Sequence, residues 1–79
     1  MSTHHCNELY HSDIGNTVTL IGWVNSNRDH GGVAFIDLRD REGLTQCVFR
    51  PETNAQIAEL AKTLRHEDVI QITGIVEER

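Results

Sequence analysis

Phe35 stands out because its aromatic ring falls among charged residues. Residues 33–39 are predicted to form a strand, in which successive side chains point to opposite faces. Three residues form the apolar face: Ala34, Ile36 and Leu38. Phe35 lies on the opposite face with Asp37 and Arg39, where core packing explains a large ring poorly. Such a ring can stack on a nucleic-acid base, and the alternative is a half-buried strand residue with no binding role.

Histidine and cysteine side chains near the N-terminus could in principle bind a metal ion. Four such residues lie there: His4, His5, Cys6 and His11. Their spacing matches none of the usual zinc patterns, and a structural zinc site needs four closed ligands, so we predict no metal. In a chain without a secretory signal, Cys6 and Cys47 are predicted to be reduced and packed rather than joined in a disulfide.

Charge is unevenly distributed along the chain. The net charge of −5 argues against a nucleic-acid partner, because phosphate contacts need clustered Lys and Arg. Residues 28–50, however, carry four arginines and four carboxylates, whereas the rest of the chain carries eight acidic and three basic residues. The arginine-bearing segment is therefore the least acidic part of the chain.

The length of 79 residues predicts one small domain. Its longest apolar run has four residues, far short of a membrane span, and the N-terminus lacks the apolar stretch of a secretory signal. We therefore expect a cytoplasmic protein with no membrane partner.

The residue pattern also predicts the elements that position Phe35. Four segments are rich in β-branched and aromatic residues and are predicted strands: residues 17–25, 33–38, 44–50 and 69–76. Residues 1–16 are predicted to be an irregular lead-in, and residues 17–79 to form the domain. Gly22 predicts a bend or bulge in the first strand. Residues 27–32 are predicted to form a turn whose two glycines adopt positive φ.

One helix is predicted between the third and fourth strands. Thr53 and Gln56 have the spacing of a capping box. An apolar stripe follows and is predicted to face the core: Ile57, Leu60, Ala61 and Leu64. Three strands, a helix and a strand is the order of an OB-fold, a five-stranded Greek-key barrel, here without most or all of the fifth strand. The expected fold class is thus all-β with one helix.

Three strings of residues resemble a known family. They are Gly22-Trp-Val, then Arg28-Asp-His-Gly-Gly, then Phe35-Ile-Asp-Leu-Arg-Asp-Arg-Glu-Gly-Leu-Thr-Gln46. In this order and spacing they resemble the N-terminal anticodon-binding domain of bacterial aspartyl-tRNA synthetases, and the likeness runs over essentially the whole chain. The family implies binding of a tRNA anticodon loop.

The resemblance also implies roles for individual residues. Phe35 would stack on the central base of the anticodon, Gln46 would hydrogen-bond that base, and Arg28 would contact the loop. Alternation independently places Gln46 on the Phe35 side of the sheet. His30 is similar to the residue of non-discriminating members, which serve both tRNA(Asp) and tRNA(Asn). No catalytic residue or cofactor is expected here, since ATP and Mg²⁺ would bind a catalytic domain of a homodimeric parent aspartate–tRNA ligase.

Other interpretations of these residues remain. Arg28 could be a solvated turn residue. The hairpin arginines Arg39 and Arg41 are expected to pair with a neighbouring carboxylate, which is Asp37, Asp40 or Glu42. Many relatives carry arginines where this chain has Ser26 and Asn27, which predicts weaker tRNA affinity.

The biological setting is open as well. The chain could be a cut piece of a longer enzyme or a natural truncated paralogue. It could also be a free-standing OB module that binds single-stranded nucleic acid or a protein. An incomplete barrel is expected to self-associate through unpaired strand edges.

Overall fold

The computed structural model describes residues 2–6, 9 and 11–77. Its elements are η1 (His11–Asp13), β1 (Thr17–His30), β2 (Val33–Asp40), β3 (Gly43–Phe49), α1 (Ala55–Lys62) and β4 (Val69–Ile75). The predicted content of strands with one helix, in this order, is confirmed.

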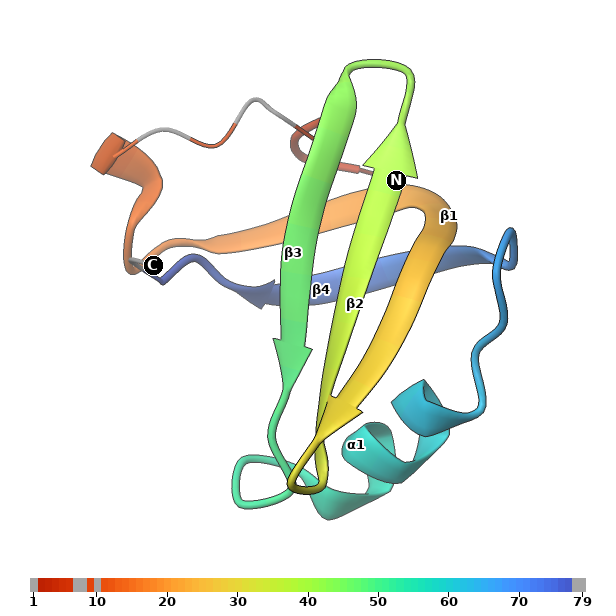
Figure 1. Ribbon diagram of the computed structural model, residues 1–79. Coiled ribbons are helices and arrows are strands. Elements are labelled where there is room, and N and C mark those ends of the chain that lie inside the picture. Colours follow the sequence, from red (N-terminus) through yellow and green to blue (C-terminus); the bar gives the residue numbers. More distant parts are fainter. Residues whose placement is uncertain (1, 7–8, 10, 78–79) are drawn as a thin grey trace.

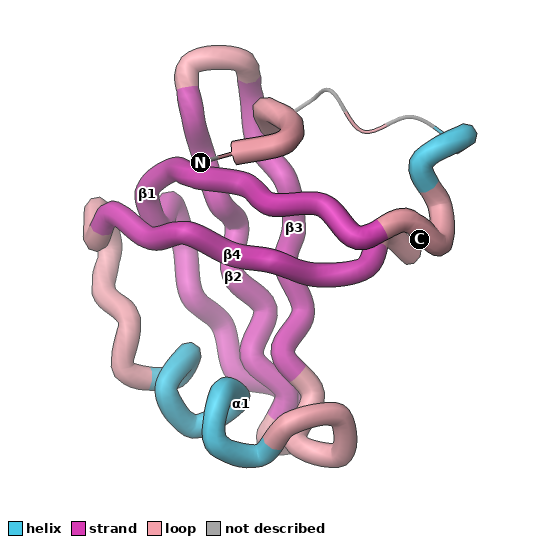
Figure 2. The backbone as a smooth tube through the Cα atoms, turned by 180° about the vertical axis from the view of Figure 1, so that it is seen from behind, coloured by secondary structure: helices cyan, strands magenta, loops and turns pink. Residues whose placement is uncertain are grey.

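The four strands form one antiparallel sheet in the order β3-β2-β1-β4. Strand β1 bends sharply, so its first half lies with β4 across one side of β2 and β3 (Figure 1). The view from behind shows the same crossing, with α1 at one end of the curled sheet (Figure 2). The result is a half-barrel in which β3 and β4 are the two edges of the described sheet.

Strand β1 is longer than predicted. It continues to His30, and only Gly31 and Gly32 remain in the turn, with φ of 60° and 87°. The prediction of a turn over residues 27–32 is therefore wrong except for its two glycines. Residues 26–30 are paired residue by residue with β2, and this pairing outweighs the low strand propensity of asparagine and aspartate.

The bend of β1 contains a bulge, but not at the predicted glycine. The register with β2 shifts between Val24 and Ser26, which places Asn25 in the bulge. Gly22 instead marks a close approach, because a Cβ there would collide with the carbonyl group of Arg39. Only glycine therefore fits where β1 crosses the end of β2.

The core fills the inside of the curl in two clusters. One lies beneath the helix and contains Val24, Ala34, Ile36 and Ala61. The other lies toward the N-terminal segment and contains Cys6, Leu20 and Leu38. The predicted buried face of β2 is confirmed, since Ala34, Ile36 and Leu38 are each fully buried. Both cysteines are free thiols, and burial raises the pKa of Cys6 and raises that of Cys47 to about 12.

Helix α1 differs from its prediction in start and in buried face. Asn54 rather than Thr53 is the N-cap, and its Oδ1 accepts a hydrogen bond of 3.0 Å from the Ile57 amide. Ala58 and Ala61 are the buried residues of the helix, whereas Ile57 and Leu60 are 49% and 63% exposed. The predicted burial of Ile57 and Leu60 is therefore wrong. The helix turns its small alanines toward the sheet, because they let the helix backbone pack closest to it.

The N-terminal segment is attached to the half-barrel by hydrogen bonds that its backbone amides donate. The Thr3 amide donates to the Thr19 carbonyl at 2.8 Å, and the Cys6 amide donates to Asp40 Oδ2 at 2.7 Å. Among the described residues, no group of three or more His, Cys, Asp and Glu side chains is placed to hold a metal ion. The side chain of His11, one of the four candidates, lies outside the described part. No described helix is long and apolar enough to cross a membrane.

Candidate nucleic-acid interface

The outer face of the half-barrel is organised in rows across β1, β2 and β3. In one row Arg28 lies opposite Phe35, which lies opposite Val48. In the next row lie Ser26, Asp37 and Gln46. The polar and aromatic residues of these two rows, together with His30 at the end of β1, form what we call the outer-face patch. It comprises Ser26, Arg28, His30, Phe35, Asp37 and Gln46.

All four residues predicted from the sequence lie in the outer-face patch. Gln46 is exposed and diagonal to Phe35, so the predicted register of β3 relative to β2 is confirmed. His30 contacts Phe35 edge to face, with 5.7 Å between ring centroids and an interplanar angle of 77°. Phe35 itself is half-buried, so its ring is fixed by neighbours while part of it remains accessible.

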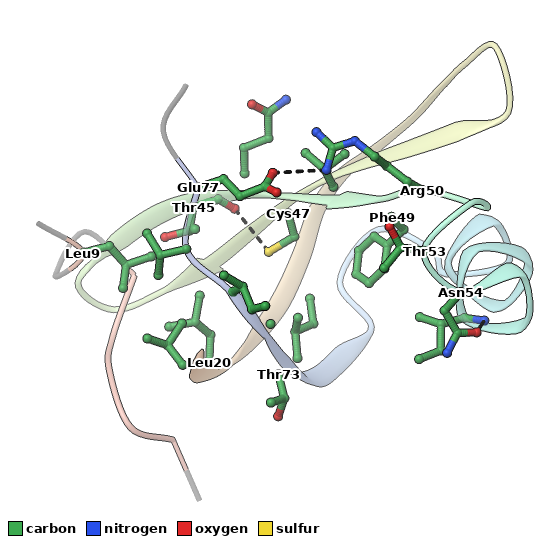
Figure 3. Close-up of a pocket in the computed structure, with 18 of the residues that line it drawn as sticks. Leu9, Leu20, Thr45, Cys47, Phe49, Arg50, Thr53, Asn54, Thr73 and Glu77 are labelled. Atoms are coloured by element: carbon green, nitrogen blue, oxygen red, sulfur yellow. Dashed lines mark hydrogen bonds and ion pairs between the residues drawn. The ribbon is translucent and has the colours of Figure 1, made fainter. Parts of the chain in front are cut away.

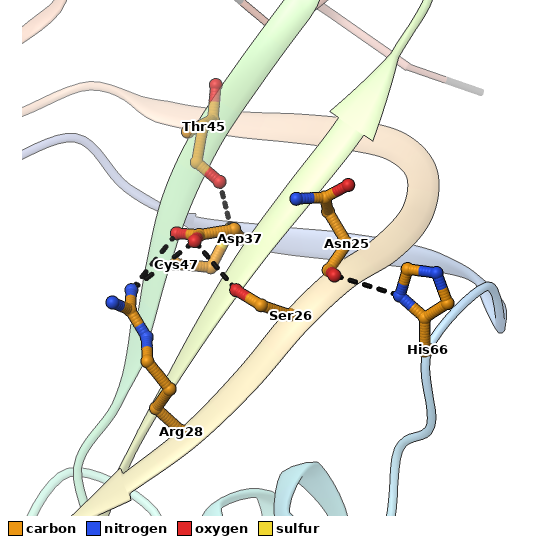
Figure 4. A network of polar contacts seen from close by, with 7 residues as sticks. All are labelled: Asn25, Ser26, Arg28, Asp37, Thr45, Cys47 and His66. Atoms are coloured by element: carbon orange, nitrogen blue, oxygen red, sulfur yellow. Dashed lines mark hydrogen bonds and ion pairs between the residues drawn. The ribbon is translucent and has the colours of Figure 1, made fainter.

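A carboxylate connects the two rows (Figure 4). Arg28 Nη2 donates to both oxygens of Asp37, at 3.3 and 3.4 Å. Ser26 Oγ donates to Asp37 Oδ2 at 2.7 Å. The Asp37 side chain is 19% exposed and that of Arg28 is 52% exposed. The ion pair therefore lies at the surface, with the carboxylate largely buried and the guanidinium partly in solvent.

Sequence reasoning missed Asp37 as a member of this site. It was one of three carboxylates expected as partners of the hairpin arginines, and the structure instead pairs it with Arg28 and Ser26 of β1. Arg39 instead donates from Nε to Asn25 Oδ1 at 3.2 Å. Arg28 and Asp37 are nine residues apart, and only the pairing register of β1 with β2 could have revealed the contact.

Ser26 and Asn27 both have structural roles in this domain. Ser26 holds Asp37 on the outer face. Asn27 lies on the inner face, where its Nδ2 donates to the carbonyl oxygens of Ala61 and Leu64, both at 2.9 Å. The amide therefore satisfies carbonyls at the C-terminal end of α1 and ties the helix to β1.

The bulge in β1 is also held from the loop before β4. His66 Nδ1 donates to the carbonyl oxygen of Asn25 at 2.9 Å (Figure 4). Backbone hydrogen bonds join Glu67 to Val24 at 2.7 Å and Val24 to Asp68 at 2.9 Å. These contacts fix the point where β1 bends, and so they fix the position of the β1 half that carries Arg28.

An apolar groove lies between the two edge strands, β3 and β4 (Figure 3). It is a groove of about 1060 Å³ lined by both edges and by inner-face residues such as Leu20 and Ile72. An ion pair of 3.1 Å between Arg50 and Glu77 links the C-terminal ends of the two edges. The groove is largely apolar, and it adjoins the outer-face patch at Gln46, which also lines the groove.

The outer-face patch offers binding groups. It presents an aromatic ring, an amide with both a donor and an acceptor, and a guanidinium with fixed donors. These groups suit a nucleic-acid base, which has a flat face and polar edges.

Comparison with known families agrees with this geometry. A family model for tRNA anticodon binding, described as an OB-fold nucleic acid binding domain, matches residues 18–79. The chain belongs to this OB-fold family. The OB-fold class predicted from the order of elements is thereby confirmed, with four strands in the described part.

Individual relatives of this OB domain are aminoacyl-tRNA synthetases. The domain is 57% identical over 77 residues to an aspartate–tRNA(Asp/Asn) ligase of Desulfatibacillum aliphaticivorans, covering 98% of this chain and 13% of that protein. A protein of the same name from Corynebacterium glutamicum (strain R) is 56% identical over 79 residues, covering 100% and 12%. The chain thus spans about an eighth of the length of these curated relatives.

Solved structures show the same relationship. The asparaginyl-tRNA synthetase from Pyrococcus horikoshii has a TM-score of 0.86 at 32% identity, covering 94% of this chain and 18% of that one. OBody AM3L09, bound to hen egg-white lysozyme, has a TM-score of 0.91 at 30% identity, covering 100% and 77%. This chain is an anticodon-binding OB domain homologous to the N-terminal domains of aspartyl- and asparaginyl-tRNA synthetases.

Proposed function

We propose that the outer-face patch recognises the anticodon loop of tRNA(Asp). Phe35 stacks on the central uridine, Gln46 hydrogen-bonds the edge of that base, and Arg28 contacts the loop beside them. The observation that carries this proposal is the gathering of the predicted residues from three strands on one exposed face. OB-folds bind oligonucleotides on this part of the barrel.

The domain contributes positioning and not bond-making in this proposal. Within a parent aspartate–tRNA ligase, anticodon binding orients the acceptor end of the tRNA toward a catalytic domain that binds ATP and Mg²⁺ and attaches aspartate. The coverage of relatives named as such ligases supports this context. A homodimeric parent and a cytoplasmic location belong to the same proposal.

We further propose that the parent serves tRNA(Asn) as well as tRNA(Asp). The curated relatives reported above are named aspartate–tRNA(Asp/Asn) ligases, and His30 is in T-shaped contact with the Phe35 ring. Charging assays with the full-length parent test this specificity. Aspartylation of tRNA(Asp) alone would show that the assignment is wrong.

Titration with anticodon stem-loops tests the recognition proposal. Stem-loops that differ only at the central base, uridine against cytidine, are titrated at fixed salt, because phosphate contacts make affinity salt-dependent. We expect tighter binding of the uridine loop. Equal affinities, or no binding, would overturn the proposal.

A protein partner is the second candidate, and one observation favours it. The OBody that resembles this chain is bound to lysozyme, so a fold of this kind can present a protein-binding surface. The same titration separates the two candidates, since a protein-binding module has no reason to distinguish the two loops.

We also propose that the domain self-associates through β3 and β4. Val69 and Ile75 on the β4 edge are 76% and 66% exposed, and the groove beside them is apolar. Exposed hydrophobic edges are templates for pairing with another chain.

A further inference from the structure

The guanidinium of Arg28 is held away from the residue directly opposite it. The register places Arg28 across from Phe35, yet its Nη2 bonds to Asp37 in the neighbouring row at 3.3 and 3.4 Å. An unrestrained arginine next to a phenylalanine can lie on the ring face through cation–π attraction. The contact with Asp37 therefore draws the guanidinium toward the row that contains Gln46.

Asp37 is itself fixed in place. Ser26 Oγ donates to its Oδ2 at 2.7 Å, and the Asp37 side chain is only 19% exposed. The carboxylate is therefore the fixed partner of this ion pair, and the more exposed Arg28 side chain adopts the conformation that reaches it. Both contacts with Asp37 use Nη2, so they do not engage the Nε and Nη1 hydrogens of Arg28.

We propose that Asp37, supported by Ser26, is a positioning residue for base recognition. It keeps the Phe35 ring open for stacking and holds the Arg28 guanidinium beside Gln46, so one stacked base meets both side chains. This inference rests on the function proposed above and names how the central base is distinguished. It also accounts for a carboxylate in the middle of a surface that binds a polyanion.

The chemistry of the base edges makes the role of Arg28 specific. Uracil carries only carbonyl acceptors beside its N3 hydrogen, whereas cytosine carries an amino group where uracil has O4. The Gln46 amide can rotate to match either base, because it has a donor and an acceptor. A guanidinium has donors only, so in this proposal it favours uracil by meeting position 4 of the stacked base, where uracil has the O4 acceptor and cytosine an amino donor.

Four proteins test this inference by stem-loop titration. They are the unmodified chain, Asp37→Asn, Ser26→Ala and the control Glu42→Gln, each titrated with uridine and cytidine loops at one salt concentration. Glu42→Gln removes the same charge as Asp37→Asn from an exposed residue in the β2–β3 hairpin turn. Ser26→Ala weakens the support of Asp37 without any change of charge.

The measured quantity is the ratio of the two dissociation constants, which a uniform loss of folded protein does not alter. We expect Asp37→Asn and Ser26→Ala to reduce this ratio about 2- to 10-fold. The reason is that the Arg28 side chain would then have to become ordered when the base binds, which costs free energy. Glu42→Gln should change both affinities together and leave the ratio unchanged. If Asp37→Asn does not fold, Ser26→Ala carries the test.

A second measurement observes the arginine without RNA. ¹⁵N relaxation of the Arg28 Nε–H group should show an ordered side chain in the unmodified protein and faster motion in Asp37→Asn and Ser26→Ala. If the unmodified chain discriminates between the two loops and both variants show the same ratio of dissociation constants, the positioning role of Asp37 is overturned. The proposed function is then unaffected. Equal binding of both loops by the unmodified chain overturns the proposed function, and the inference falls with it.

Discussion

Phe35 is half-buried in the OB domain, with Arg28 opposite it on β1 and Val48 opposite it on β3. His30 contacts the ring in a T-shaped arrangement. A ring fixed in this way loses little conformational entropy when a base stacks on it. This property suits it for binding an unstacked base of a single-stranded loop.

Replacement of Phe35 by alanine tests the stacking role. We expect Phe35→Ala to weaken binding of the uridine stem-loop by about 1 to 3 kcal/mol, the usual value of one base–aromatic stack. Fluorescence anisotropy at fixed salt measures the loss. Val48→Ala truncates the neighbour in the same row and should leave affinity nearly unchanged. A fall in melting temperature without loss of affinity would instead indicate a purely structural ring.

At the scale of elements, the β2–β3 hairpin and the N-terminal segment meet at Asp40. Its carboxylate accepts hydrogen bonds from the amides of Cys6, Glu42 and Gly43, at 2.7, 2.8 and 3.2 Å. Burial raises the pKa of Asp40, but these three amide donors outweigh it and leave the pKa below its usual value. The ionised form therefore stabilises the fold.

This lowered pKa predicts how stability changes with pH. The contribution of Asp40 is complete above its unfolded pKa of about 3.9 and is lost as the pH falls through the folded pKa. At pH 7 we expect Asp40→Asn to lower the free energy of unfolding by about 1 to 2 kcal/mol, and the difference to vanish in acid. Urea unfolding between pH 7 and pH 2 measures both effects.

A matched control for Asp40 is Asp29→Asn near the C-terminal end of β1. Within the described part of the chain, the Asp29 side chain accepts one backbone hydrogen bond, from Gly32 at 3.0 Å. Its replacement should cost less than that of Asp40. Equal losses for the two variants would contradict the role assigned to the Asp40 junction.

The crossing of β1 over β2 depends on the missing side chain of Gly22. A Cβ at this position would collide with the backbone carbonyl of Arg39, which cannot rotate away like a side chain. We expect Gly22→Ala to lower the free energy of unfolding by about 1 to 3 kcal/mol in thermal or urea unfolding. Gly74→Ala on β4 is the control, because no atom lies within 4 Å of its added Cβ. Similar effects of both substitutions would show that the close approach is not what requires glycine.

The face of each element could be predicted where burial is one-sided. Alternation in β2 correctly separated Ile36 from Phe35, because successive side chains in a strand point to opposite faces. The helix was less predictable, because its buried side contains Ala58 and Ala61 and leaves Ile57 of the predicted stripe half-exposed. Which residues face inward depends on how closely the helix packs against the sheet.

At the scale of the whole molecule, the half-barrel exposes the edges of β3 and β4 with an apolar groove between them. We expect a concentration-dependent dimer in light scattering, because edge pairing would cover this surface. Val69→Lys on the β4 edge should shift the equilibrium toward monomer. Leu60→Lys changes a residue of comparable exposure on α1 and should not. A strictly monomeric protein at high concentration would contradict edge pairing.

The sequence by itself determined the order of elements, the two faces of β2 and the identity of four residues in the outer-face patch. These features follow from local periodicity, from residue type and from strings that resemble one family. Tertiary structure alone decided which residues became neighbours. It paired Arg28 with Asp37, moved the bulge to Asn25, and gave Ser26 and Asn27 structural roles. The physical reason is that alternation assigns a side chain to a face, whereas only the hydrogen-bond register between strands assigns it a partner.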